Sequence, residues 1–364
     1  MNEIELKKLG KISRLTNRTF NFDKRIETGF FSANYFIKAT NIVRKFEPNH
    51  IVVMQFFQRR DPAYVCGLDE SIALVHTFAK NPGNLRIEAL NDGDKVKSLE
   101  PVLRITGKYE DFGFLESLID GILARRSSVC TNVRETVLAA GKTPIFSMAD
   151  RQDDYLTQIG DGYATFIGGI EKVSTNAQGS YNGVDGIGTM PHALIQVCGG
   201  DILKAANYYL EMYPNDSLTA LIDYNNNVVY DSVNLAKTLG KKLNAVRVDT
   251  SISLVDHYFD NVEDKTDLHG VCAPLIFGLR KELDKVGAKH VKIIVSSSFT
   301  KEKIAEWVKN KVPVDMYGVG TSLIYNLSVG FTGDLVMLDG KPQAKAGRSL
   351  IKTKRLKVVP YPIY

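Results

Sequence analysis

The segment VKIIVSSSFTKEKI, residues 291–304, joins an apolar run to a helical pattern through a turn of small hydroxyl residues. The β-branched run predicts a strand, and the serines predict a strand-to-helix turn. From about Gly141 onward the chain repeats this alternation, which is typical of βα units around a parallel sheet. The other predicted strands are TPIFSM (143–148), EKVST (171–175), GIGTM (186–190), SLTALIDY (217–224), NAVRVDT (244–250) and VDMYGVG (314–320). Seven such units favour an α/β fold with a closed or irregular (β/α) barrel rather than an open sheet.

The two ends of the chain predict a second domain. Segments 49–79 and 85–130 contain the strands and helices of an α+β sandwich, with NDGD (91–94) as a turn between two strands. Near the C-terminus, DGK (339–341) predicts the tip of a hairpin whose strands extend the same sheet. We therefore expect a composite α+β domain of residues 1–130 with 325–364, and a barrel domain of residues 131–324.

Composition excludes several classes of function. The 46 basic and 41 acidic residues are interspersed and leave a net charge of only +5, so nucleic-acid binding is not indicated, whereas a phosphorylated small molecule is compatible. The four cysteines are widely separated, which argues against a zinc site or a disulfide framework and favours reduced core thiols. The N-terminal segment has no apolar signal region, and we expect a cytoplasmic protein without a membrane span.

Polar residues and glycines follow most of the predicted strands. In a barrel the carboxyl ends of the strands converge on one face, where such enzymes keep their active site. Residues far apart in the sequence are therefore expected to be neighbours there. They are Arg151, Thr175, Asn176, Thr189, His192, Asp223, Arg247, Asp249, Ser296 to Ser298, Gly318 and Gly320.

The last two predicted units favour a phosphate site. Ser297 and Ser298 follow one strand, and Gly318 and Gly320 end the next. Backbone N–H groups at such turns, with the positive ends of the following helices, bind phosphate in many barrels. The alternative is two plain turns in which a serine caps the helix.

Several charged residues have both a structural and a functional interpretation. Arg247 and Asp249 lie two residues apart on one strand, so their side chains share a face. They form either a structural ion pair or a binding site in which Arg247 contacts an anionic or aromatic ring and Asp249 binds sugar hydroxyls. Asp223 either caps a helix or contacts ribose or Mg²⁺. Arg125, with Arg126 at the predicted end of an apolar helix, either complements the helix dipole or clamps a pyrophosphate.

His192 lies in GIGTMPHALIQ (186–196), which predicts a helix start with Pro191 at the first helical position. A histidine in a first helical turn is usually a solvated or hydrogen-bonded residue. Its place after a predicted barrel strand makes it a candidate for catalysis as well.

The ordered set of motifs resembles the nicotinate phosphoribosyltransferase family over nearly the whole chain. These motifs are SANYFIKAT, MQFFQRRD, GILARRSSVCTNV, GDGYA, VSTNAQG, GIGTMPHALI, ALIDY, VRVDTS, YGVGTSL and AKAGR. The resemblance implies a type II phosphoribosyltransferase fold and head-to-tail dimers with shared active sites. It also implies the reaction of nicotinate with phosphoribosyl pyrophosphate, with Mg²⁺ and ATP hydrolysis.

The resemblance also implies roles for individual residues. Tyr35 would stack on the pyridine ring from a neighbouring subunit, and Arg247 would lie against that ring from its own chain. Arg151 would bind diphosphate or the ring carboxylate, and Thr175 would hydrogen-bond near the base. Asp223 and Asp249 would hold ribose hydroxyls or Mg²⁺, and the 5′-phosphate would lie on the two turns named above. His192 would be phosphorylated by ATP.

The sequence departs from the family pattern at two places. Ser296, Ser297 and Ser298 stand before Phe299 where the family often has S-G-G-F, and Asn176 replaces a frequent Asp. Nicotinamide or quinolinate remain alternative bases, and a non-catalytic phosphosugar-binding barrel remains an alternative function. A phosphosugar aldolase or isomerase is disfavoured because no predicted strand end offers a Lys or Glu.

Overall fold

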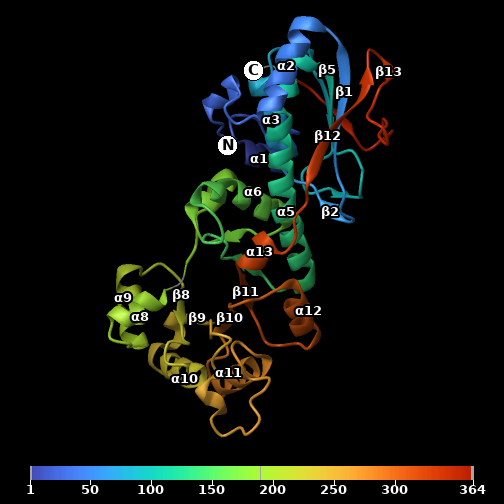
Figure 1. The fold of residues 1–364 in the computed structure, drawn as a ribbon. Helices are drawn as coiled ribbons and strands as arrows, with labels where there is room; N and C mark the ends of the chain where they lie inside the picture. The colour runs from blue at the N-terminus through green and yellow to red at the C-terminus, as the bar shows by residue number, and fades with distance from the viewer. Residues whose placement is uncertain (1, 189, 362–364) are drawn as a thin grey trace.

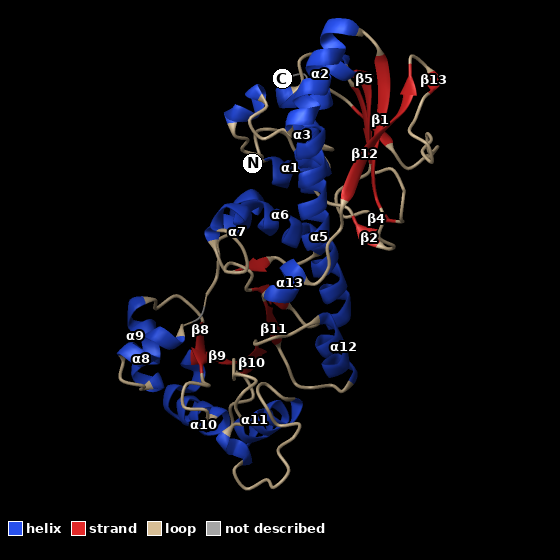
Figure 2. Cartoon of the chain, viewed as in Figure 1, coloured by secondary structure: helices blue, strands red, loops and turns tan. Residues whose placement is uncertain are grey.

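The computed structural model describes residues 2–188 and 190–361, which form two sheets connected by one long helix (Figure 1). The antiparallel sheet lies at one end of an elongated molecule, and the parallel sheet lies toward the other end (Figure 2). Helix α5, Glu116–Ala140, extends between them. Its 25 residues contain no proline, and a helix of that length spans about 37 Å.

The antiparallel sheet takes strands from both ends of the chain, as predicted. Its order is β13, β12, β1, β5, β3, β14. The bounds are β1 Ile51–Gln58, β3 Arg86–Ala89, β5 Leu103–Lys108, β12 Phe331–Leu338, β13 Lys341–Pro342 and β14 Lys357–Val359. In β5, buried residues alternate with half-exposed ones, so one face packs on a core and the other meets solvent. The predicted hairpin is confirmed, because β12 and β13 pair around Asp339 and Gly340.

The parallel sheet has six strands in the order β7, β6, β11, β10, β9, β8, and it curls into a half-barrel. The bounds are β6 Ile145–Ser147, β7 Lys172–Val173, β8 Leu218–Leu221, β9 Leu243–Val248, β10 Lys292–Val295 and β11 Met316–Val319. In β10 the last three residues are all buried, as expected of a strand covered on both faces. Within the described residues, β7 and β8 are edge strands.

The seventh predicted strand, GIGTM at 186–190, is wrong: its described residues are irregular. Ile187 N–H donates to the Val173 carbonyl oxygen at 2.9 Å, so the described part of the segment passes β7 without forming a ladder. Gly186 packs so closely on Thr175 that an added Cβ would lie 2.5 Å from its backbone carbonyl carbon. Two glycines and a following proline weaken a strand, which explains the failure of the prediction.

Helices lie on one side of the antiparallel sheet and around the parallel sheet (Figure 2). Their bounds are α1 Glu3–Lys8, α2 Asn34–Phe46, α3 Leu68–Phe78, α4 Tyr109–Phe112, α6 Gln158–Gly168, α7 Asn176–Gly179, α8 His192–Val197, α9 Ile202–Met212, α10 Val228–Leu239, α11 Ala273–Lys285, α12 Lys301–Lys309 and α13 Thr321–Tyr325. Local sequence explains several starts. The Thr300 hydroxyl, for example, accepts a hydrogen bond from Lys303 N–H and caps α12.

One local prediction is confirmed and another needs correction. The NDGD turn at 91–94 is present between β3 and β4 (Lys95–Val96), and Asp94 N–H donates to the Asn91 carbonyl oxygen at 3.1 Å. The two strands belong to different sheets, because β3 pairs in the large antiparallel sheet whereas β4 pairs with β2 (Ala63–Tyr64). Arg125 and Arg126 do not end a helix, because α5 continues for four more turns to Ala140. The expected boundary between residues 130 and 131 lies within this helix, and the division into two domains stays a prediction.

All four cysteines are buried and unpaired, in agreement with the prediction of core thiols. Among the described residues, no helix combines the length and the apolar character needed to cross a membrane.

Candidate active site

The carboxyl edge of the parallel sheet brings together many of the predicted site residues. Asp223 follows β8, Asp249 follows β9, Ser296 follows β10 and Gly320 follows β11. These four strands are consecutive neighbours in the sheet. Parallel strands all end at the same edge, so the polar residues after them are placed side by side.

Asp249 forms the centre of one group of contacts. Arg247, the fifth residue of β9, donates from Nη2 to Asp249 Oδ2 at 3.1 Å. The buried Ser296 donates from its hydroxyl to Asp249 Oδ1 at 2.6 Å. Both carboxylate oxygens therefore have a partner, and a charged acceptor held in this way has a well-defined orientation. The predicted Arg247–Asp249 pair is present, and it lies at the edge of the sheet rather than in the core.

His192 and Asp223 form a second group. His192 Nε2 lies 3.0 Å from Asp223 Oδ2, and the imidazole side chain is 45% exposed whereas the Asp223 side chain is only 8% exposed. Burial raises the pKa of Asp223, and the contact with His192 opposes that rise. Asp223 Oδ1 is buried and has no hydrogen-bond partner among the described residues. This oxygen is therefore available to a ligand.

The turn after β10 has an unusual backbone. Ser297 and Ser298 have φ angles of 76° and 57°, in the left-handed region that side chains other than glycine rarely adopt. Two consecutive residues of this kind are costly, and such strain is typical of functional sites. Gly318 and Gly320 lie at the end of the neighbouring strand, β11. A Cβ added at Gly318 would lie 2.8 Å from Met148 Sδ, and one added at Gly320 would lie 2.9 Å from the Met148 carbonyl oxygen. Only glycine fits at these two positions without a shift.

The residues after β6 and β7 are placed differently. Arg151 is exposed in the loop after β6. Thr175 caps α7, because its hydroxyl accepts from Gln178 N–H at 3.1 Å and lies 2.9 Å from Gln158 Oε1. Asn176 Oδ1 accepts from Gly186 N–H at 2.8 Å, which holds the loop before His192. Their predicted contacts with the base stay predictions.

Arg125 takes part in a network of charged side chains. Its guanidinium donates to both oxygens of Asp161 on α6, at 2.9 and 2.7 Å, and it also pairs with Asp153 at 2.9 Å. The neighbouring Arg126 donates to both oxygens of Glu70 on α3, at 2.8 and 3.0 Å. The pair therefore ties α5 to α6 and α3, a role that the sequence patterns did not indicate.

Two predicted residues lie elsewhere. Tyr35 is 65% exposed on α2, beside the antiparallel sheet, and its ring centroid is 4.3 Å from that of Phe36. Within one chain α2 lies away from the edge of the parallel sheet (Figure 1). Thr189 lies outside the described residues.

Ser296 is the contact residue that the predicted set of ligand-binding residues omitted. The sequence predicts Ser296 at the end of a strand, but it predicts ligand contacts only for Ser297 and Ser298. A signal was present, because a serine at the end of one strand and an aspartate at the end of its neighbour are expected to meet. The order of strands needed for that inference comes from the structure.

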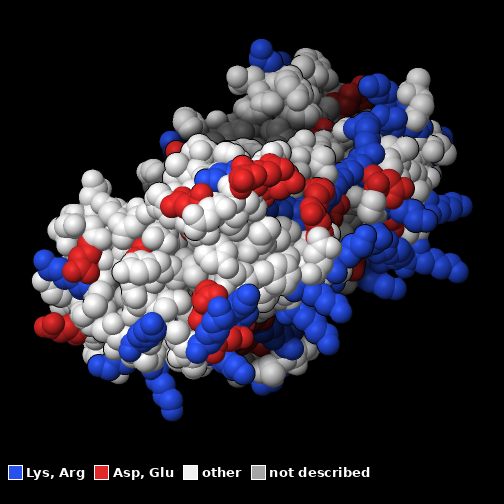
Figure 3. Space-filling view, turned by 90° about the horizontal axis from the view of Figure 1, so that it is seen from below, with Lys and Arg blue, Asp and Glu red and all other residues white. Residues whose placement is uncertain are grey.

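Surface charge agrees with the composition. On the face that Figure 3 shows, acidic side chains lie among the lysines and arginines.

Comparison with known sequences identifies relatives. Residues 34–127 match the family described as quinolinate phosphoribosyl transferase, N-terminal domain. A nicotinate phosphoribosyltransferase of Mycobacterium tuberculosis is 26% identical over 267 residues, which cover 71% of this chain and 55% of the relative. A nicotinate phosphoribosyltransferase of Bacillus subtilis is 22% identical over 240 residues, 65% of this chain and 45% of the relative. The chain thus spans about half the length of these curated relatives.

Solved structures agree with this fold. The nicotinate-nucleotide pyrophosphorylase of Pyrococcus furiosus is 29% identical, with a TM-score of 0.79 over 94% of this chain and 85% of its own. Human nicotinic acid phosphoribosyltransferase has a TM-score of 0.67 at 16% identity, over 87% of this chain and 77% of its own. The motifs, the two sheets and these matches agree: the chain has the type II phosphoribosyltransferase fold and is similar to nicotinate phosphoribosyltransferases.

Proposed function

We propose that this protein transfers the phosphoribosyl group of phosphoribosyl pyrophosphate to nicotinate, forming nicotinate mononucleotide and pyrophosphate with hydrolysis of ATP. The observation that carries the proposal is the row of neighbouring strand ends that holds Asp223, Asp249 and the strained serine turn. A phosphorylated sugar needs a phosphate site and acceptors for its hydroxyls in one place, and this edge offers both.

Glycosyl transfer passes through a sugar with positive character at the anomeric carbon. The bond to the pyrophosphate oxygen breaks with its electron pair, and the ring nitrogen of the base supplies the pair for the new bond. Oriented carboxylates near the ribose stabilise that charge, and Asp249 is held in one orientation by Arg247 and Ser296. The chain then needs no covalent nucleophile for this step.

The buried Asp223 Oδ1 fits the Mg²⁺ that the family implies. Mg²⁺ commonly takes one or two carboxylates and completes its shell with phosphate oxygens and water. Among the described residues, no group of three His, Cys, Asp or Glu side chains forms a metal cage, so the substrate's phosphates would supply the other ligands. When bound, the ion would neutralise charge on the leaving pyrophosphate. Asp223, and Asp249 beside it, would position it.

His192 is the residue that we assign to the use of ATP. If Nε2 donates its proton to Asp223, the lone pair on Nδ1 is free to attack the γ-phosphorus. The N–P bond forms as the P–O bond to ADP breaks, and ADP leaves with the bonding pair. Water later hydrolyses the phosphohistidine and returns the free imidazole and phosphate.

Labelled ATP tests this assignment. The parent protein should incorporate an acid-labile, base-stable phosphate, and ATP should stimulate formation of nicotinate mononucleotide. His192→Asn should lose both. The matched control is His50→Asn, which removes another histidine paired with an aspartate, Asp339 at 2.6 Å, on the antiparallel sheet. A His192 variant that still incorporates phosphate would show that the residue only begins α8.

The base is tested by comparing nicotinate, nicotinamide and quinolinate, each with and without ATP. We expect kcat/KM for nicotinate to exceed that for nicotinamide at least about 100-fold, or roughly 2.7 kcal/mol, because Arg151 and Arg247 favour a carboxylate. Similar rates with both bases would contradict this preference.

Quinolinate is the second candidate base. The match of residues 34–127 and the likeness to the Pyrococcus furiosus pyrophosphorylase favour it. Quinolinate carries a second carboxylate, so its conversion to nicotinate mononucleotide must also release CO₂. Release of CO₂ in step with pyrophosphate would establish quinolinate as the substrate and exclude nicotinate as the principal one.

The family resemblance implies an active site shared between two copies of the chain, and Tyr35 is 65% exposed and so accessible to a second copy. Tyr35→Ala and Asp249→Ala should each be inactive, and a mixture of the two should regain activity, because one hybrid site then receives both intact residues. If the subunits exchange and no activity returns, the shared site is wrong.

A further inference from the structure

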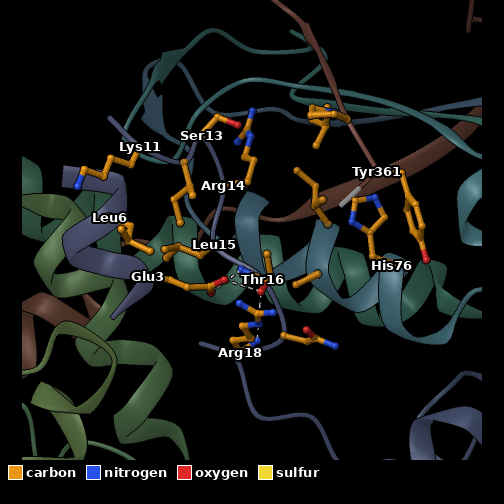
Figure 4. Close-up of a pocket in the computed structure, with 16 residues that line it drawn as sticks. Glu3, Leu6, Lys11, Ser13, Arg14, Leu15, Thr16, Arg18, His76 and Tyr361 are labelled. Carbon is orange, nitrogen blue, oxygen red and sulfur yellow. Dashed lines mark hydrogen bonds between the residues drawn. The ribbon is translucent and has the colours of Figure 1, made fainter. Parts of the chain in front are cut away.

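A pocket of about 400 Å³ opens between the N-terminal segment, helix α3 and the end of the described chain (Figure 4). Its charged side chains include Arg14, which donates to Asp69 at 3.0 Å, and Glu3, which accepts from the Thr16 hydroxyl at 2.6 Å. These two side chains are engaged with the protein itself. A hydrogen-bond donor that no described residue uses lies instead at the carboxyl edge of the parallel sheet, on Gln152.

The loop after β6 lies against the end of β11. Met148 N–H donates to the Val319 carbonyl oxygen at 2.8 Å, and Gly320 follows directly in the chain. A Cβ added at Gly320 would lie 2.9 Å from the Met148 carbonyl oxygen and 3.4 Å from Gln152 Nε2. Apart from the residues next to Gly320 in the chain, the amide of Gln152 is therefore the side-chain group nearest to that position.

Hydrogen bonds fix the orientation of the Gln152 amide. The Thr321 hydroxyl donates to Gln152 Oε1 at 2.8 Å, and the Tyr325 hydroxyl donates to the main-chain carbonyl oxygen of Gln152. Since Oε1 faces Thr321, the other end of the amide places Nε2 beside Gly320. No described residue accepts a hydrogen bond from this nitrogen, which carries two N–H donors. The side chain is half-buried, so its donors are stabilised by a ligand that accepts from them.

The acidic side chains of the same loop have other partners. Asp150 Oδ1 accepts from the Ser174 hydroxyl at 2.6 Å, and Asp153 lies 2.9 Å from Arg125. Asp154 accepts from a main-chain N–H two residues further on, at 2.8 Å. The loop therefore places a neutral donor, and not one of these carboxylates, against the end of β11.

The two turns of the candidate phosphate site are joined beside this amide. The Ser322 hydroxyl donates to the Phe299 carbonyl oxygen at 2.8 Å, which ties the start of α13 to the residue after Ser298. At Gly318, an added Cβ would lie 3.2 Å from the Cβ of Ser296, so the ends of β10 and β11 are also in close contact. A phosphate bound by both turns would thus lie next to the end of β11 and its unused amide donor.

We propose that Gln152 binds the 5′-phosphate of phosphoribosyl pyrophosphate by donating a hydrogen bond from Nε2 to a phosphate oxygen. Thr321 holds Oε1 and so keeps the N–H donors on the side of Gly320. A hydrogen bond to a charged acceptor is stronger than one between neutral groups. This inference rests on the proposed function, because it takes the two turns as the site of the 5′-phosphate.

Two substitutions at Gln152 separate binding from a structural role. Gln152→Glu keeps an oxygen for the Thr321 hydroxyl but replaces the donor by a negative oxygen, whereas Gln152→Met keeps the approximate size and removes both functions. In calorimetric titration, Gln152→Glu should weaken binding of ribose 5-phosphate at least about 100-fold, and Gln152→Met should weaken it about tenfold. The opposite order, with Gln152→Glu close to the parent, would show that the side chain only supports Thr321 and would overturn the proposal.

A second titration identifies which phosphate the amide contacts. Inorganic pyrophosphate, added in the presence of saturating ribose 5-phosphate, represents the leaving group. Gln152→Met should bind it as the parent does. Weaker binding of pyrophosphate with unchanged binding of ribose 5-phosphate would place the amide at the leaving group and overturn the proposal. The matched control is Gln343→Glu, at an exposed position after β13, which should bind both ligands as the parent does.

Steady-state kinetics separates this proposal from the proposed function. Gln152→Met should raise KM for phosphoribosyl pyrophosphate about tenfold and leave kcat for nicotinate mononucleotide formation unchanged. A parent protein that binds ribose 5-phosphate but forms no mononucleotide from nicotinate would overturn the proposed function alone. Equal binding of ribose 5-phosphate by the parent and both Gln152 variants would overturn the role of Gln152 alone. A parent protein that does not bind ribose 5-phosphate would overturn both.

Discussion

The two sheets of this protein place their charged residues in different ways. In the antiparallel sheet, charged residues lie within the strands: Arg104 Nη1 of β5 lies 3.7 Å from Glu88 Oε2 of β3, and Asp334 Oδ2 of β12 lies 2.6 Å from Nε of Arg348 in the loop after β13. In the parallel sheet the last residues of β10 are all buried, and the candidate site residues Asp223 and Asp249 come after their strands end.

The difference follows from which faces meet water. A sheet with one open face solvates polar side chains at alternate positions, whereas a sheet covered on both faces tolerates them only at its edges. In the parallel sheet this requirement places the polar site residues together at the carboxyl edge. Variants in the two regions should therefore affect different properties, activity at the parallel edge and stability elsewhere.

The largest effect is expected at Asp249. Asp249→Asn removes the charge beside the ribose and should lower kcat/KM by about 10³, or ~4 kcal/mol, without loss of folding. Steady-state kinetics and circular dichroism measure the two quantities. Asp284→Asn is the matched control, because Asp284 also pairs with an arginine, Arg280 at 2.8 Å, but on the outer helix α11. A decrease of less than tenfold in the Asp249 variant would remove this residue from the mechanism.

The next effect concerns packing rather than chemistry. At Gly162, on α6, an added Cβ would lie 2.0 Å from the carbonyl oxygen of Gln178, and backbone cannot easily withdraw. Gly162→Ala should lower the free energy of unfolding by about 3 kcal/mol in urea denaturation. At Gly121 on α5 an added Cβ meets nothing within 4 Å, so Gly121→Ala should raise the free energy of unfolding by about 0.5–1 kcal/mol. Destabilisation of equal size at both positions would contradict the packing argument.

A pH-dependent effect is expected at the antiparallel sheet. Burial, with Asp120 and Asp334 nearby, raises the pKa of Glu116 to about 8. A raised pKa means that the neutral acid stabilises the fold below the unfolded value near 4.5, and that this contribution is lost as the pH rises toward 8. Glu116→Gln should therefore match the parent at pH 4 and exceed its stability at pH 9 by about 2 kcal/mol, allowing for solvent screening.

Thermal unfolding across pH measures this difference. Glu171→Gln, at an exposed position before β7, is the control and should follow the parent at every pH. If Glu116→Gln and Glu171→Gln give the same curve, the carboxyl cluster does not limit stability at alkaline pH.

The smallest effect concerns the turn of Ser297 and Ser298 at the carboxyl edge of the parallel sheet. A substitution there should increase the stability of the fold but weaken the binding of phosphoribosyl pyrophosphate. Ser298→Gly relieves a left-handed backbone and should stabilise the fold by about 0.5–1 kcal/mol, while the loss of a hydroxyl should raise KM for phosphoribosyl pyrophosphate. Lys311→Gly, at φ 54° after α12, should give the same gain in stability with an unchanged KM. A KM that rises equally in both variants would mean that Ser298 has no special contact with the phosphate.

Local patterns were sufficient for much of the fold. The structure contains the predicted strands and helices of 49–130, the hairpin at 339–341 and six of the seven predicted parallel strands. They could be predicted because strand period and turn chemistry are local properties. The failure, GIGTM at 186–190, is a local pattern that lacked a partner: among its described residues, Ile187 N–H bonds to β7, but they form no strand. The NDGD turn is present, and only the structure shows that it separates strands of different sheets.

The contacts of the candidate site depended on the order of the strands. His192 and Asp223 are 31 residues apart, Arg125 and Asp161 are 36 apart, and Asp249 and Ser296 are 47 apart. The sequence by itself determined which residue types follow each strand, and hence that an acidic and hydroxyl-rich edge exists. Only the tertiary structure decided which of them meet, which oxygen of Asp223 is left without a partner, and that Arg125 binds α6 instead of ending a helix. The physical reason is that residue type and period act over a few neighbours, whereas a side-chain contact between strands requires the sheet that brings distant segments together.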